Sequence, residues 1–65
     1  MIGKVTSFND SKGFGFIETD TRDSIFVHYT EIQGPGFKTL AEDQRVEFEL
    51  YEDHKGLTAK NVRKL

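Results

Sequence analysis

Residues 12–29 read KGFGFIETDTRDSIFVHY, and this stretch decides the fold that we expect for the chain. Large apolar side chains recur at every second position on both sides of the short polar segment 20–23. Alternation with a period of two is typical of a half-buried β-strand, and a short polar connection joins two antiparallel strands. The stretch therefore predicts a hairpin of two strands, at residues 13–19 and 24–29.

Three further strands are expected around this hairpin. One covers residues 4–9 and reaches the hairpin through residues 10–12, which gives a meander of three strands. The alternation of Val46, Phe48 and Leu50 with polar residues predicts a strand at 45–51. A last strand is expected at 57–63, where Ala59 and Val62 share a face only if a β-bulge lies between them.

The segment before the fourth strand contains the breaker cluster Gln33-Gly34-Pro35-Gly36, and a short helical turn is expected after it at residues 39–43. A chain of 65 residues is long enough for one domain, which we expect to span residues 1–65. Five short strands favour a closed barrel, because closure removes exposed strand edges. We predict an all-β fold, a small five-stranded antiparallel barrel of the OB-fold type. An SH3-like barrel is the alternative, since strand number and length do not separate the two.

Composition excludes several classes of function. The chain has 0 Cys, which excludes disulfides, zinc ribbons and thiol nucleophiles and indicates a cytoplasmic protein. Its two histidines, His28 and His54, lack the close spacing of metal ligands, so we expect neither a metal site nor a cofactor. No segment approaches the roughly 20 apolar residues of a membrane span, and no signal peptide is evident, so no membrane partner is expected.

The formal net charge of −2 argues against a strongly basic DNA binder. The charge is unevenly distributed: residues 42–53 contain six acidic residues and one arginine, whereas residues 54–65 contain four cations and no acid. A local anion-binding surface is therefore compatible with the sequence if the acidic segment faces elsewhere.

Alternation in the hairpin divides its side chains between two faces. Phe14, Phe16 and Phe26 share one face with Glu18 and His28, and the other face carries the β-branched Ile17, Ile25 and Val27. If the phenylalanines were inside, Glu18 and His28 would be buried with them at a cost of several kcal/mol. The sequence therefore predicts that the phenylalanine face is exposed, and an exposed aromatic patch on a small domain indicates a binding surface.

Unpaired bases are a suitable ligand for such a surface, because each base that stacks on an aromatic ring contributes about 1–3 kcal/mol. Paired bases are already stacked, so the surface should select single strands. Lys12 at the start of the hairpin, with Lys38 and Lys55 in flanking loops, could contact phosphates.

The string Lys12-Gly13-Phe14-Gly15-Phe16-Ile17 fits the start of the RNP1 pattern. Together with Ile25-Phe26-Val27-His28-Tyr29 it makes the chain resemble the bacterial cold shock protein family, a five-stranded OB barrel that binds single-stranded RNA and DNA. The resemblance covers nearly the whole chain. It also includes Gly3-Lys4-Val5, Phe8-Asn9, Ile32-Gln33-Gly34, Gly36-Phe37-Lys38-Thr39-Leu40 and Asn61-Val62.

The resemblance implies a stacking surface with Lys12 as an adjacent cation. Its members are Phe14, Phe16, Phe26, His28, Tyr29 and Phe37, with Phe8 at the margin. Alternation alone places Tyr29 opposite Phe26, so its inclusion requires the strand to end or twist at that point.

The chain departs from the family pattern at several positions. Thr6 and Ser7 stand where the family usually has Lys and Trp, Ser24 where Asp is common, and Leu57 where Pro is common. The loss of one stacking ring worth about 1–3 kcal/mol would lower affinity by roughly 5- to 150-fold.

The function implied is that of a single-stranded nucleic-acid-binding protein, an RNA chaperone or a transcriptional or post-transcriptional regulator of the cold shock type. It is expected to act as a monomer in the cytoplasm, without a small-molecule substrate. The alternative is a diverged domain whose aromatic face docks a protein partner, which the acidic balance and Ser7 would suit. An enzyme is not expected, because His28 on an open sheet lacks an orienting carboxylate and a water-excluding pocket.

Overall fold

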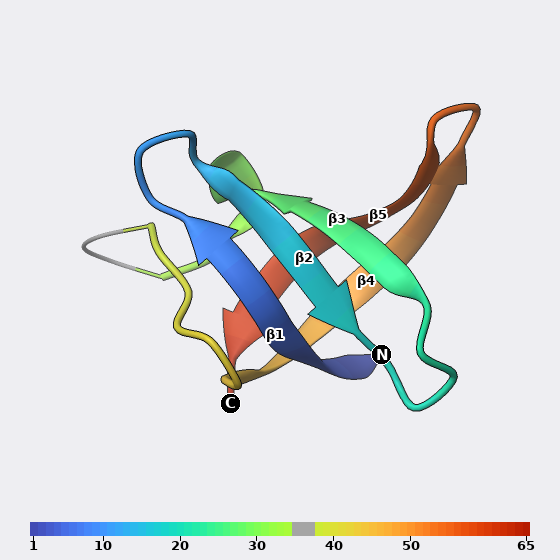
Figure 1. Cartoon of the computed structure of the whole chain (residues 1–65), viewed down its shortest axis with the longest axis horizontal. Helices are drawn as coiled ribbons and strands as arrows, with labels where there is room; N and C mark the ends of the chain where they lie inside the picture. The colour runs from blue at the N-terminus through green and yellow to red at the C-terminus, as the bar shows by residue number, and fades with distance from the viewer. Residues whose placement is uncertain (35–37) are drawn as a thin grey trace.

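The computed structural model describes residues 1–34 and 38–65, which form five strands and one short 3-10 helix (Figure 1). The strands are β1 (Ile2–Asn9), β2 (Phe14–Glu18), β3 (Ser24–His28), β4 (Arg45–Asp53) and β5 (Gly56–Lys64), and the helix η1 (Tyr29–Glu31) follows β3. They close into a barrel in the order β1-β2-β3-β5-β4. This architecture confirms the predicted OB-type barrel.

One strand pair differs from the antiparallel barrel that the sequence predicts. β3 pairs with β5 in parallel, through Phe26 with Thr58 and Val27 with Ala59, whereas the other four pairs are antiparallel. Five strands cannot alternate in direction around a closed ring, so at least one neighbouring pair must be parallel. The predicted meander of β1, β2 and β3 is confirmed.

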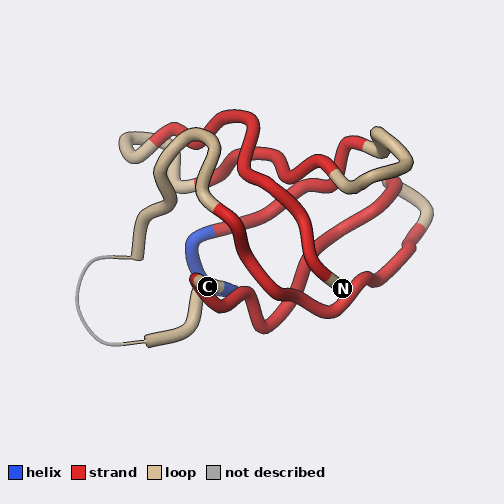
Figure 2. The backbone as a smooth tube through the Cα atoms, turned by 90° about the horizontal axis from the view of Figure 1, so that it is seen from below, coloured by secondary structure: helices blue, strands red, loops and turns tan. Residues whose placement is uncertain are grey.

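The core lies inside the ring of strands, which Figure 2 shows from below. Its buried apolar side chains come from all five strands and from the segment between η1 and β4: Val5, Ile17, Ile25, Val27, Ile32, Leu40, Val46, Phe48, Ala59 and Val62. Burial of such side chains is the main source of stability for a domain of this size.

The last strand contains the bulge that Ala59 and Val62 need in order to share a face. The pairing of β4 with β5 shifts by one residue between Glu47 and Glu49, and Asn61 takes the left-handed conformation, with φ of 52°. The extra residue brings Ala59 and Val62 onto the same side, and both are fully buried.

A second bulge lies in β1, where the register with β2 shifts between Val5 and Ser7. The shift turns Ser7 outward, opposite Phe16, and sends Phe8 toward the core, opposite Gly15. Gly15 admits no side chain there, because a Cβ atom would lie 2.2 Å from the carbonyl oxygen of Ser7.

The helical turn predicted at residues 39–43 is wrong. Residues 41–44 instead form a turn in which the Gln44 N–H donates to the Ala41 carbonyl over 3.1 Å. The Asp43 N–H donates to the Val5 carbonyl over 2.7 Å, and the Val5 N–H donates to the Gln44 carbonyl over 2.9 Å. These bonds to β1 replace the bonds that a helical turn would make within itself.

Within the described residues, the structure contains no helix of the length and apolar character needed to cross a membrane.

Candidate nucleic-acid interface

The outer face of β2 and β3 carries the phenylalanines, as predicted. Phe14 pairs with His28 and Phe16 pairs with Phe26 across the two strands, while Ile17 and Val27 point into the core. Phe16 is 37% exposed, and Phe14, Phe26 and His28 are half-buried. Burial of the β-branched face decides the orientation, because it leaves Glu18 and His28 in contact with water.

The rings of Phe14, Phe16 and Phe26 pack on one another and form what we call the aromatic cluster. Phe14 and Phe26 are stacked with their centroids 5.6 Å apart, and the Phe16 ring meets both edge-on, at 6.5 and 6.0 Å. These are favourable geometries for aromatic pairs. Each ring therefore holds its neighbours in place and keeps part of its surface exposed.

The strand end required to bring Tyr29 onto this surface is present. β3 stops at His28, and Tyr29 opens the helix η1 with its ring centroid 4.6 Å from that of His28. His28 also caps η1, because its Nδ1 accepts a hydrogen bond from the Thr30 N–H over 3.4 Å. The same Nδ1 lies 2.9 Å from the Thr30 hydroxyl, so Thr30 holds the His28 ring at the start of η1.

Tyr29 lies on the backbone of Gly13 at the start of β2. A Cβ atom on Gly13 would come within 2.6 Å of the Tyr29 ring, and Gly13 also has a positive φ of 76°. The Tyr29 N–H donates to the Gly13 carbonyl over 2.8 Å. Only glycine suits both the positive φ and the close approach of the ring. Gly13 therefore allows the Tyr29 ring to lie directly against the backbone of β2.

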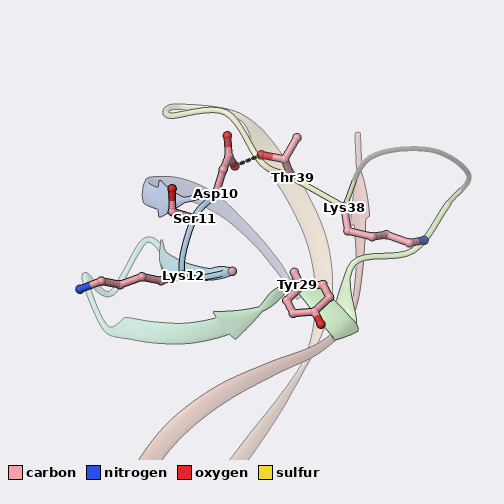
Figure 3. A pocket seen from close by; sticks show the side chains of 7 residues that line it. Asp10, Ser11, Lys12, Tyr29, Lys38 and Thr39 are labelled. Carbon is pink, nitrogen blue, oxygen red and sulfur yellow. Dashed lines mark hydrogen bonds between the residues drawn. The ribbon is translucent and has the colours of Figure 1, made fainter.

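A recess of about 700 Å³ opens beside Tyr29, between the β1–β2 turn and the loop that leads to β4 (Figure 3). The Thr39 hydroxyl donates to the Asp10 carboxylate and ties the loop to the turn. Lys12 extends away from the recess on one side, and Lys38 on the other donates to the Gly34 carbonyl. Both predicted cations therefore flank the recess.

The remaining predicted site residues fall in three groups. Phe8 packs against the core, although it also borders a depression lined by Lys12, Phe14 and Phe16. Lys55, in the β4–β5 turn, lines a recess together with Phe16 and Phe26. Phe37 lies outside the described residues.

Sequence reasoning missed Thr58 as a neighbour of the aromatic cluster and named Leu57 only as a departure from the family pattern. Thr58 is paired with Phe26, and Leu57 lines the recess beside Phe16 and Phe26. Both are placed by the parallel pairing of β3 with β5, which joins segments far apart in the chain. No local pattern in the sequence signals that pairing.

Within residues 1–34 and 38–65, no three His, Asp or Glu side chains are grouped closely enough to hold a metal ion. All buried side-chain polar atoms in this part of the chain have hydrogen-bond partners.

Comparison with known proteins places the chain in a family. The family model described as the "'Cold-shock' DNA-binding domain" matches residues 1–65. The chain is 54% identical over 63 residues to cold shock protein CspD of Bacillus subtilis, a match that covers 97% of this chain and 96% of the relative. It is 54% identical over 65 residues to cold shock-like protein CspLB of Listeria monocytogenes, a match that covers 100% of this chain and 98% of the relative.

A solved structure shares the fold of this chain at a lower sequence identity than these relatives. The chain named drosophila Unr CSD456 superposes with a TM-score of 0.75 at 25% identity, over 98% of this chain and 26% of that longer one. The family match spans every strand of the barrel, including both strands that carry the aromatic cluster. The chain belongs to the cold shock domain family.

Proposed function

We propose that this protein binds single-stranded RNA and DNA by stacking unpaired bases on the aromatic cluster and on His28 and Tyr29. The observation that carries the proposal is the outward position of three phenylalanine rings in a barrel that needs apolar side chains for its core. Stacking on such rings is tolerant of base identity, because every base has a flat face.

The proposed phosphate contacts are Lys12, Lys38 and Lys55. Lys12 and Lys38 flank the recess beside Tyr29, and Lys55 lies at the other end of the aromatic cluster. Phe8 supports the margin of this surface from beneath. The family resemblance adds Phe37 as a further proposed stacking residue. Few cations lie along the surface, so stacking should outweigh charge in the binding energy.

The acidic segment leaves this surface largely free. β4 pairs with β1 and β5 and is not a neighbour of β2 or β3. Glu47 and Glu49 point outward from β4 and are bound by Arg63 and Asn61 of β5, each over 2.5 Å. Asp53 is the exception, because it lines the recess with Lys55.

Binding of this kind supports the role of an RNA chaperone or regulator. A protein that binds only unpaired segments shifts the folding equilibrium of RNA by mass action, without ATP and without catalysis. We propose that residues 1–65 act as one cold shock domain, as a monomer in the cytoplasm, with no cofactor or small-molecule substrate.

The test compares a short single-stranded pyrimidine oligonucleotide with the matching duplex by calorimetry, at low and at moderate salt. The single strand should bind with modest salt dependence, and the duplex should bind far more weakly. Equal affinity for the two would contradict stacking, because the bases of a duplex cannot reach the rings. Binding of neither would contradict the proposed function as a whole.

A further inference from the structure

Three cations outside the proposed stacking surface line one recess. It lies at the end of the barrel opposite to the recess beside Tyr29. Lys4 of β1, Arg22 of the β2–β3 turn and Arg45 at the start of β4 line one recess of about 530 Å³, with Glu18 and Asp20 also in its wall. This volume lies within the range of small-ligand sites in proteins. One third of the nine cations of the chain therefore lies in this recess.

The backbone fixes the positions of these three residues. Lys4 is paired with Glu18 on one side and with Arg45 on the other. Arg22 has a positive φ of 63°, and its N–H donates to the Thr19 carbonyl over 2.9 Å, which closes the turn. The recess is thus built from paired strands and a closed turn.

The cationic groups of the recess have no acidic partner within the described part of the chain. Among the described residues, the one ion pair joins Arg63 to Glu47, which both lie outside this recess. Lys38 is occupied by the Gly34 carbonyl, and Lys60 lies over the Tyr51 ring. The carboxylates of Glu18 and Asp20 lie in the same recess but beyond ion-pair distance of Lys4, Arg22 and Arg45. Three cations without partners in one recess are suited to an anion.

The recess continues the surface that carries the aromatic cluster. Lys4 and Glu18 form one cross-strand pair, and Ser7 and Phe16 form the next pair on the same outer face. Glu18 and Phe16 are two residues apart on β2, a separation of about 7 Å along the strand. A nucleic-acid strand that is stacked on Phe16 and continues along β2 would reach this recess.

We propose that Lys4, Arg22 and Arg45 bind a backbone phosphate of the single strand held by the aromatic cluster. The proposal rests on the proposed function and adds a site to it. A guanidinium presents paired N–H donors that match phosphate oxygens, and two arginines from different elements can hold one phosphate from two sides. Glu18 and Asp20 oppose the anion, so the phosphate is bound between the arginines and away from the carboxylates.

The salt dependence of binding measures this contact directly. For single strands, the logarithm of the binding constant falls with the logarithm of salt concentration by about 0.7 per phosphate neutralised. Arg45→Gln and Arg22→Gln should each give a slope shallower by up to about 0.7. Arg63→Gln is the matched control, since it removes the same charge from β5 outside the recess and should leave the slope unchanged.

Strand length provides a second measurement. Oligonucleotides of about 4 and about 8 nucleotides span the lower range of site sizes for this fold. The arginine variants should lose affinity for the longer strand and retain most of it for the shorter strand, which the aromatic cluster can hold alone. Glu18→Gln should strengthen binding of the longer strand.

Failure of this proposal and failure of the proposed function give different results. Phe16→Ala should weaken binding of both the shorter and the longer oligonucleotide. It should leave the salt dependence of the binding constant unchanged. Normal stacking behaviour together with unchanged slopes in Arg22→Gln and Arg45→Gln would overturn the phosphate site alone. Absence of single-strand binding by the wild-type chain would instead overturn the proposed function. Circular dichroism and thermal unfolding check that each variant is folded.

Discussion

Ser7→Trp should tighten single-strand binding, because the bulge in β1 turns residue 7 outward beside the aromatic cluster. Ser7 is exposed and lies directly opposite Phe16 in the register of β1 and β2. Side chains at directly opposed positions have Cβ atoms about 5 Å apart, close enough for an indole to contact the Phe16 ring. The substitution would extend the stacking surface across β1.

The gain should be of order 1 kcal/mol, at the low end of the range for base stacking. One face of the indole would be used in packing against Phe16, which leaves the other face for a base. The neighbouring residue adds nothing, because the Thr6 hydroxyl donates to the Phe16 carbonyl over 3.2 Å and carries no charge. A gain of this size corresponds to about a 5-fold lower Kd.

Calorimetric titration with one oligonucleotide should measure both proteins under the same conditions. The wild-type chain has no Trp, so the variant also provides a fluorophore whose quenching reports stacking. Ala41→Trp is the control for an exposed indole in general, since Ala41 is exposed and lies in the turn before β4. Unchanged or weaker binding by a folded Ser7→Trp variant would show that residue 7 does not border the bound strand.

Five substitutions at four positions test the face assignment and the backbone. Phe16→Ala should weaken binding by about 1–3 kcal/mol and cost less stability than the 3–5 typical of buried phenylalanine, whereas Ile17→Ala should cost about 2–5 kcal/mol of stability. Urea unfolding combined with calorimetry separates these effects, and the reverse pattern would mean that the faces are exchanged. Gly15→Ala should destabilise the barrel by at least about 1–3 kcal/mol, measured by urea unfolding, because its Cβ would collide with the β1 backbone; wild-type stability would show that the bulge is absent. Asn61→Ala should lower the melting temperature more than Asn61→Gly, since the left-handed backbone costs a non-glycine residue about 1–2 kcal/mol. Equal melting temperatures of the two variants would count against a strained backbone at the β5 bulge.

The faces of β2 and β3 were predictable because two local signals agree. Ile17, Ile25 and Val27 are β-branched and apolar, and the opposite phase includes the costly Glu18 and His28. Every residue in these two strands alternates without interruption, so one correct assignment determines the rest. The aromatic cluster therefore follows from sequence with no knowledge of the barrel.

The orientation of β1 was not predictable in the same way. Its bulge reverses the phase after Val5, and the residues around it carry no glycine or proline that would mark the position. The family resemblance implies a place for Phe8 at the margin of the binding surface, and after the bulge Phe8 packs against the core while it still borders the depression beside Phe14 and Phe16. The bulge is placed by Gly15 of the neighbouring strand, whose missing side chain admits the β1 backbone.

The net negative charge of the protein is compatible with binding a polyanion because of where the barrel places its charges. The shortest extent of the barrel is 17 Å, about two Debye lengths at physiological salt, so charges on opposite sides are largely screened from each other. Glu47 and Glu49 are additionally bound by β5 side chains. What a bound strand encounters is therefore set by the nearby residues. These are the aromatic cluster, Lys12 and Lys55 beside it, and Lys4 where the surface continues toward Arg45, with Asp53 and Glu18 as the acidic residues among them. Net charge describes the whole molecule, whereas binding depends on the face that β2 and β3 present.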